Sequence, residues 1–113
     1  MTTLAATAHV PTVKASRYLQ QLCKHWAHNL PVEFSSDAGT VTFPKDARGN
    51  AFPGDAVLTL RARQRALEVR IDATAPEQLE GLKGAVARHL DGFAFREAPL
   101  AVDWQPPASE SDR

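Results

Sequence analysis

The chain has 113 residues, enough for one domain with a single modest core and too few for two. Thirteen basic side chains balance thirteen acidic ones, so no overall field favours nucleic acid or an anionic membrane as a partner. The single cysteine excludes an internal disulfide, and the first residues lack the basic start and long apolar run of a signal peptide. We therefore expect a cytoplasmic protein with no membrane span.

The chain opens with the pattern of a strand followed by a helix. Apolar residues alternate over residues 4–10, which is typical of a half-buried strand. From Val13 to about Leu30 the apolar spacing becomes that of a helix. Thr12 is a plausible N-cap, and Pro31 discourages a helical residue before it.

The middle of the chain reads as strands and breakers. Residues 32–34 and 40–43 form a hairpin around a turn at residues 35–39. The stretch 44–55 is rich in proline, glycine and asparagine, so we expect a loop. A loop of this length in so small a domain is either mobile or functional.

The second half predicts two strands, a helix and a last strand. Alternation is clearest over 56–61 and 66–72. Residues 74–77 have the pattern of a capping box with proline inside the first turn, so we expect a helix from there to about Gly92. Residues 100–104 alternate again, and a polar, flexible tail follows over 106–113.

The order strand, helix, four strands, helix, strand predicts one α+β domain over residues 1–105. Its antiparallel sheet has five to six strands, and the two helices pack on one face. The other face carries threonines and charged residues, so it faces either solvent or a second copy of the chain. We expect a monomer or a homodimer.

The first helix holds the only cysteine and two of the four histidines. On a helical wheel Cys23 and His25 diverge by about 160°, which prevents them from sharing one metal ion. Cys23 is expected to pack as a small hydrophobe. His28 points outward, whereas His25 lies on the shoulder of the apolar stripe. His25 and His28 can share an ion, but tetrahedral zinc requires more ligands than two.

The second helix places His89 in an equivalent position, beside the apolar stripe that holds Leu82 and Val86. If the helices lie side by side, His25 and His89 line their seam, and Tyr18 lies close enough to hydrogen-bond one of them. Such a group can hold a proton, a ligand or an ion. The commoner outcome is that these side chains satisfy one another as a half-buried polar network.

The segment after the second helix, residues 93–97, is also unusual. Phe93 and Phe95 are followed by Arg96 and Glu97, a set that can clamp a planar or anionic ligand. The same residues can equally plug the core, with a surface ion pair worth under about 1 kcal/mol. The chain has no nucleophile elbow, phosphate loop or dinucleotide fingerprint, which favours a domain that is not an enzyme.

Several of these segments together resemble a known family. They are Ser16–Leu19, Leu22–Trp26 with His28, Phe43–Pro44, His89–Leu90, Phe93–Glu97 and Val102–Trp104. Over about residues 7 to 105 the chain resembles the bacterial domain of unknown function 2218. The resemblance implies a small stand-alone domain, or one fused to the flavin-dependent siderophore-interacting proteins that release iron from ferric siderophores. The loop at 44–55 is longer than the turn expected in relatives.

The favoured interpretation is a non-enzymatic accessory domain that binds a small ligand or a protein partner. By the resemblance, that partner is a siderophore-interacting flavoprotein. The candidate ligand contacts are Tyr18, His25, His89 and Arg96. No cofactor is predicted. One alternative is an enzyme or metalloprotein that holds iron or zinc through His25, His28 and His89, and another is a structural module that dimerises through its open sheet face or edge strands.

Overall fold

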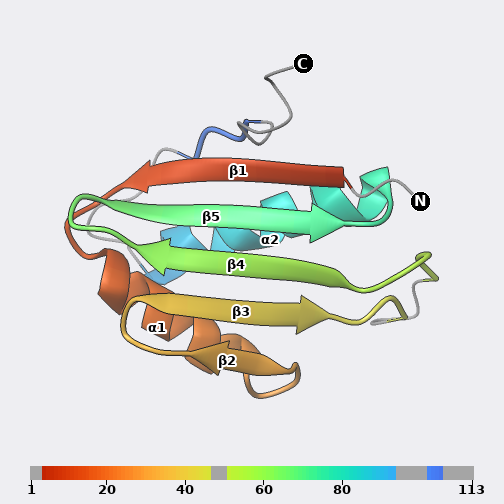
Figure 1. Cartoon of the computed structure of the whole chain (residues 1–113), viewed down its shortest axis with the longest axis horizontal. Helices are drawn as coiled ribbons and strands as arrows, with labels where there is room; N and C mark the ends of the chain where they lie inside the picture. Colours follow the sequence, from red (N-terminus) through yellow and green to blue (C-terminus); the bar gives the residue numbers. More distant parts are fainter. Residues whose placement is uncertain (1–3, 47–50, 94–101, 106–113) are drawn as a thin grey trace.

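A five-stranded antiparallel sheet forms the centre of the protein. The structure is a computed structural model that describes residues 4–46, 51–93 and 102–105. The strands are β1 (Leu4–Pro11), β2 (Val32–Phe34), β3 (Ala38–Phe43), β4 (Ala56–Ala62) and β5 (Ala66–Ala73), and the helices are α1 (Ala15–Trp26) and α2 (Pro76–Phe93). Both helices lie behind the sheet in Figure 1, so the predicted α+β fold with two helices on one face is confirmed.

The strand order is β1-β5-β4-β3-β2, which places the first two strands of the chain at opposite edges of the sheet. The helix α1 therefore carries the chain across the sheet, and it packs mainly on β3 and β4, with fewer contacts to β2 and β5. The helix α2 covers β5 and β1 and also contacts α1 (Figure 1). No helix in the described ranges is both long and apolar enough to span a membrane.

The core lies between the helices and the sheet, and β5 shows how the sequence places it. Leu67, Val69 and Ile71 are buried, as their alternation predicts, while the residues between them are partly exposed. On the helix side the buried residues of α1 are Ala15, Tyr18, Leu19, Leu22, Cys23 and Trp26. This set confirms the apolar direction read from the helical wheel.

The helix α1 is shorter than the predicted span of 13–30. Thr12 does not cap its first turn but accepts a hydrogen bond from the backbone N of Lys14, at 3.0 Å, and so holds the bend before the helix. At the other end the backbone N atoms of Asn29 and Leu30 both donate to the carbonyl of Trp26, at 3.1 and 2.9 Å. The chain thus leaves the helix by turning around Trp26.

The start of α2 is fixed by Gln78 rather than by the predicted capping-box residue Glu77. The backbone N of Thr74 donates to Gln78 Oε1 at 2.7 Å, and the Thr74 hydroxyl lies 2.8 Å from the same oxygen. Gln78 Nε2 donates to the carbonyl of Gly54 at 3.0 Å, and the Gly54 N donates to Thr74 Oγ1 at 3.1 Å. These bonds attach the segment before β4 to the first turn of α2.

The strand predicted over residues 100–104 is not present in its described part. Residues 102–104 are not in the sheet, and residues 100 and 101 lie outside the described ranges, as does the expected tail at 106–113. Gln105 instead exchanges two backbone hydrogen bonds with Thr7 of β1, each 2.7 Å long. Val102 and Trp104 pack against the core, so their alternation reflects side-chain packing without strand pairing.

Candidate functional site

Two histidines from different helices meet where α1 and α2 lie side by side. His25 lies in the last turn of α1, and His89 lies one turn before the end of α2. Their Nε2 atoms are 3.1 Å apart, and their ring centroids are 4.7 Å apart. The sequence left open whether the two rings meet, and the structure brings them together at the helix seam, whereas their role as ligand contacts stays a prediction.

The hydrogen bonds of the pair determine which nitrogens carry protons. His89 Nδ1 lies 2.6 Å from the carbonyl oxygen of Ala85, which can only accept, so this nitrogen is the donor. In a neutral ring His89 Nε2 is then an acceptor. His25 must therefore donate its Nε2–H to His89, and His25 Nδ1 is left as an acceptor.

Aromatic neighbours fix the orientation of the two imidazoles. The ring of His89 lies 5.1 Å from that of Trp26, which in turn meets Phe43 edge-on at 5.4 Å. His25 meets Phe93 edge-on at 6.0 Å. These separations fall in the range in which aromatic rings attract one another, so contacts with Trp26 and Phe93 restrain the two imidazole rings.

The pair borders a cleft of about 890 Å³ between the two helices and the loop from β3 to β4. Its apolar wall is formed by Trp26, Leu30, Phe43, Phe52 and Leu82. Its polar lining consists of His25, Asn29, Asp46, Glu77, Gln78, Arg88 and His89. This combination of aromatic surface with a few hydrogen-bonding groups is typical of a small-molecule site.

Three charged side chains that line the cleft have no charge partner among the described residues. Within the described part of the chain, Asp46, Glu77 and Arg88 make no side-chain hydrogen bond or ion pair. Arg88 lies back along α2 over Gly84, where an added Cβ would come within 3.0 Å of its guanidinium. Because Gly84 has no side chain, the Arg88 guanidinium has room to lie beside the cleft.

The loop at 44–55, predicted to be mobile or functional, contributes to this cleft. The backbone N of Lys45 donates to Asp55 Oδ1 at 2.9 Å, and the backbone N of Phe52 donates to the Lys45 carbonyl at 3.0 Å. These bonds bring the two described ends of the loop together. Phe52 therefore joins the aromatic wall, which no local pattern in the sequence predicts.

Of the other predicted site residues, the two that the structure describes lie elsewhere. Tyr18 is buried in the core at 3% exposure and does not line the cleft, because it lies two helical turns, about 10 Å, from His25. His28 is exposed and is likewise not part of the lining. Arg96 lies outside the described residues. In the described ranges no three His, Cys, Asp or Glu side chains are arranged to hold a metal, so the trio His25, His28 and His89 is not gathered.

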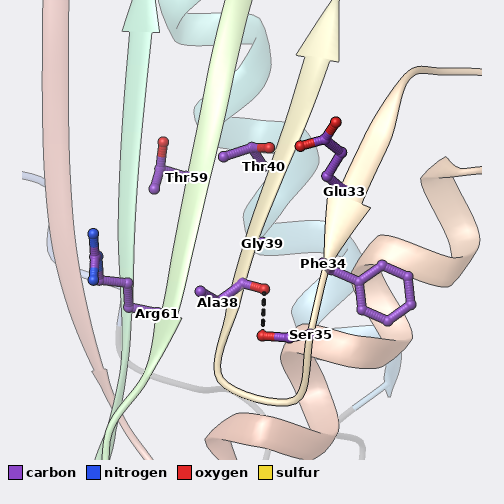
Figure 2. Close-up of a pocket in the computed structure, with 8 residues that line it drawn as sticks. All are labelled: Glu33, Phe34, Ser35, Ala38, Gly39, Thr40, Thr59 and Arg61. Atoms are coloured by element: carbon purple, nitrogen blue, oxygen red, sulfur yellow. Dashed lines mark hydrogen bonds between the residues drawn. The ribbon is translucent and has the colours of Figure 1, made fainter.

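A second, smaller hollow of about 400 Å³ lies on the sheet. Figure 2 shows Glu33, Thr40, Thr59 and Arg61 on the face that points away from the helices, next to the turn closed by Ser35 and Ala38. The Ser35 hydroxyl donates to the Ala38 carbonyl at 3.5 Å. This hollow contains none of the predicted site residues, and the helix cleft remains the stronger candidate.

Comparison with known proteins agrees with the fold and names no activity. A family model described as an uncharacterised protein conserved in bacteria, domain of unknown function 2218, matches residues 7–105. The NMR structure of PA4090 from Pseudomonas aeruginosa is similar, with a TM-score of 0.69 and 29% sequence identity over 91% of this chain and 96% of that chain. No curated protein matches the chain significantly.

Proposed function

The chain belongs to the bacterial family called domain of unknown function 2218, and from its geometry we propose that it binds a small organic molecule in the helix cleft. In this proposal the domain is an accessory binding protein and not an enzyme. Its polar contacts are His25 and His89. Tyr18 is too deeply placed to be a contact.

The observation that carries the proposal is the joined pair His25 and His89 at the border of an aromatic-lined cleft. At about 890 Å³ the cleft is within the size range of small-molecule sites, about 300–1,000 Å³. Among the residues that the structure describes, His25 Nδ1 and the Arg88 guanidinium have no hydrogen-bond partner, so both can bond an incoming molecule. When a ligand covers these two groups, they lose bound water. The burial of the ligand's apolar surface against the apolar wall of the cleft offsets that cost.

A planar aromatic chelator is the ligand class that best joins the cleft to the family resemblance. The resemblance implies an association with siderophore-interacting flavoproteins, and an aromatic ring with two adjacent hydroxyls, a catechol, is a planar group that can chelate iron. A catechol or hydroxybenzoate ring can pack on the aromatic wall beside Phe43 while one of its hydroxyls donates to His25 Nδ1. The flavoprotein partner itself stays a prediction.

The test adds 2,3-dihydroxybenzoate, benzoate or an aliphatic acid to the protein. Binding of each probe is monitored by the NMR chemical shifts of the Trp26 indole and the Phe52 ring. We expect the dihydroxy acid to shift both signals and to bind more tightly than the other two. His25→Gln removes the acceptor nitrogen and His89→Gln removes the ring that orients it, so each should weaken binding about three- to tenfold, the effect of one neutral hydrogen bond. Thermal stability should change little.

His28→Gln is the matched control, because His28 lies on the exposed side of the same helix segment and does not line the cleft. It should bind the probe as the wild type does. Probes that leave both signals unmoved, or a large loss of stability in the histidine variants with unchanged binding, would refute the proposed site.

A further inference from the structure

The His25–His89 pair has the spacing of two neighbouring ligands of one metal ion. Imidazole nitrogens lie about 2.0–2.1 Å from zinc. If an ion lay at that distance from both nitrogens, which are 3.1 Å apart, the N–metal–N angle would be roughly 95–102°, between a right angle and the tetrahedral value. The spacing that suits an N–H···N hydrogen bond therefore also suits chelation.

His89 is already arranged as metal-binding histidines usually are. Such residues donate their second ring N–H to a carbonyl or carboxylate, which fixes the tautomer and directs the other nitrogen at the ion. His89 Nδ1 donates to the Ala85 carbonyl at 2.6 Å, so its Nε2 lone pair points at His25. The contact with Trp26 further restricts rotation of the ring.

His25 can supply the second lone pair by moving one proton between its own nitrogens. In the hydrogen-bonded pair His25 carries its proton on Nε2, the atom that faces His89. His25 is exposed, so the other tautomer can place the proton on Nδ1 and donate it to water. Each Nε2 atom then carries a lone pair, and no proton is left between them.

We propose that His25 and His89 bind one divalent zinc, nickel or copper ion at the border of the cleft. Nitrogen ligands select these late first-row metals over magnesium and calcium, which require oxygen. In the described ranges no third metal-binding side chain completes the site, so water or a molecule in the cleft occupies the other coordination positions. The inference uses the same histidines as the proposed function but does not require its organic ligand.

The test is a zinc titration of the untagged full chain, followed by calorimetry and by the ring nitrogen NMR signals of the histidines. We expect one zinc per chain, with the Nε2 signals of His25 and His89 shifting and those of the other histidines unchanged. His25→Gln should weaken zinc binding at least about tenfold, because removing even a group that only hydrogen-bonds a metal ligand typically costs that much affinity. His25 is exposed, so this variant keeps its fold even if His89→Gln does not.

His28→Gln serves again as the control and should bind zinc as the wild type does. If His28→Gln loses as much affinity as His25→Gln, the ion is held by α1 alone and the proposal fails. It also fails if wild type takes up no zinc, or if His25→Gln binds it unchanged. Repeating the organic-probe experiment in EDTA separates the two ideas, because the proposed small-molecule site should still bind its probe without metal.

Discussion

Cys23 shows how its position on a helix decides the chemistry of a side chain. The helical wheel predicts that it packs on the shoulder of the apolar stripe, and the structure buries it completely. Burial raises the pKa of the Cys23 thiol to about 11, because the charged thiolate loses its water. The neighbouring Lys24 does not offset this loss, since it is exposed and follows Cys23 directly along the helix.

We therefore expect the folded protein to resist alkylation of Cys23. A pKa raised from 9.0 to about 11 lowers the thiolate fraction near pH 8 on the order of 100-fold, and burial slows the reagent further. Mass spectrometry after a short iodoacetamide pulse should find native protein unmodified and urea-unfolded protein fully modified. A native rate within about tenfold of the unfolded rate would contradict the sealed position.

The residue scale also shows which parts of the site could be read from the sequence. Wheel angles place His25 and His89 each on a shoulder of the apolar stripe of its own helix, but whether the two rings meet depends on how the helices pack against each other. The same angles mislead for Tyr18, because an angle ignores the distance along the helix axis. Phe52 and Arg88 could not be predicted, since one depends on how a long loop closes and the other on space above a glycine.

At the scale of the elements, β3 and α1 approach each other closely at Gly39. The sequence assigns Gly39 to a turn, but it is a buried residue of β3, paired with Phe34 of β2. A Cβ at this position would lie 2.7 Å from Cys23 Sγ and 3.1 Å from Phe34 Cβ. The glycine is therefore needed for space, and it sets how near α1 lies to the sheet.

Gly39→Ala should destabilise the protein by about 1–3 kcal/mol, the usual effect of forcing an extra methyl group into a packed core. The free energy of unfolding in urea measures the effect. In a Cys23→Ala background the same change should cost less, because the sulfur atom that it meets has been removed. Equal costs in both backgrounds would show that the contact with Cys23 is not the cause.

Gly81→Ala is the matched control for this prediction. Gly81 lies inside α2, and an added Cβ there has no atom within 4 Å. Alanine in a helix interior is favoured over glycine by about 0.8–1.0 kcal/mol, so this variant should be slightly more stable than the wild type.

The whole molecule has two sheet edges of different character. At β1 the edge is partly closed by Gln105, which bonds to Thr7. At the other edge β2 has only three residues, and its Phe34 is 39% exposed. Short edge strands limit pairing with another chain. Whether the protein is a monomer or a homodimer stays a prediction, and light scattering at two concentrations tests it.

Gln105→Pro should weaken the closed edge. Proline has no backbone N–H, so the 2.7 Å hydrogen bond from Gln105 N to the Thr7 carbonyl is lost, at a cost of about 1 kcal/mol. Gln105→Ala keeps that N–H and should unfold at the wild-type urea concentration. If both variants lose the same stability, the side chain of Gln105 and not its backbone closes the edge.

Most of this architecture follows from two periods in the sequence. A period of two locates β4 and β5, and a period near 3.6 locates both helices, because each element buries one face in a single core. The failures occur where alternation has another cause. Val102 and Trp104 alternate because their side chains pack on the core. The isolated bridge between Gln105 and Thr7 is too short to form a strand.

The path of α1 from one sheet edge toward the other has a consequence for assembly of the histidine pair. His25 and His89 are 64 residues apart in the chain, and every strand from β2 to β5 lies between them. Neither half of the protein can form the pair alone, and closing so long a segment has an entropic cost that only the finished core repays. The contact between the two rings is therefore a signature of complete folding, and any molecule or ion that requires both histidines selects the fully assembled domain.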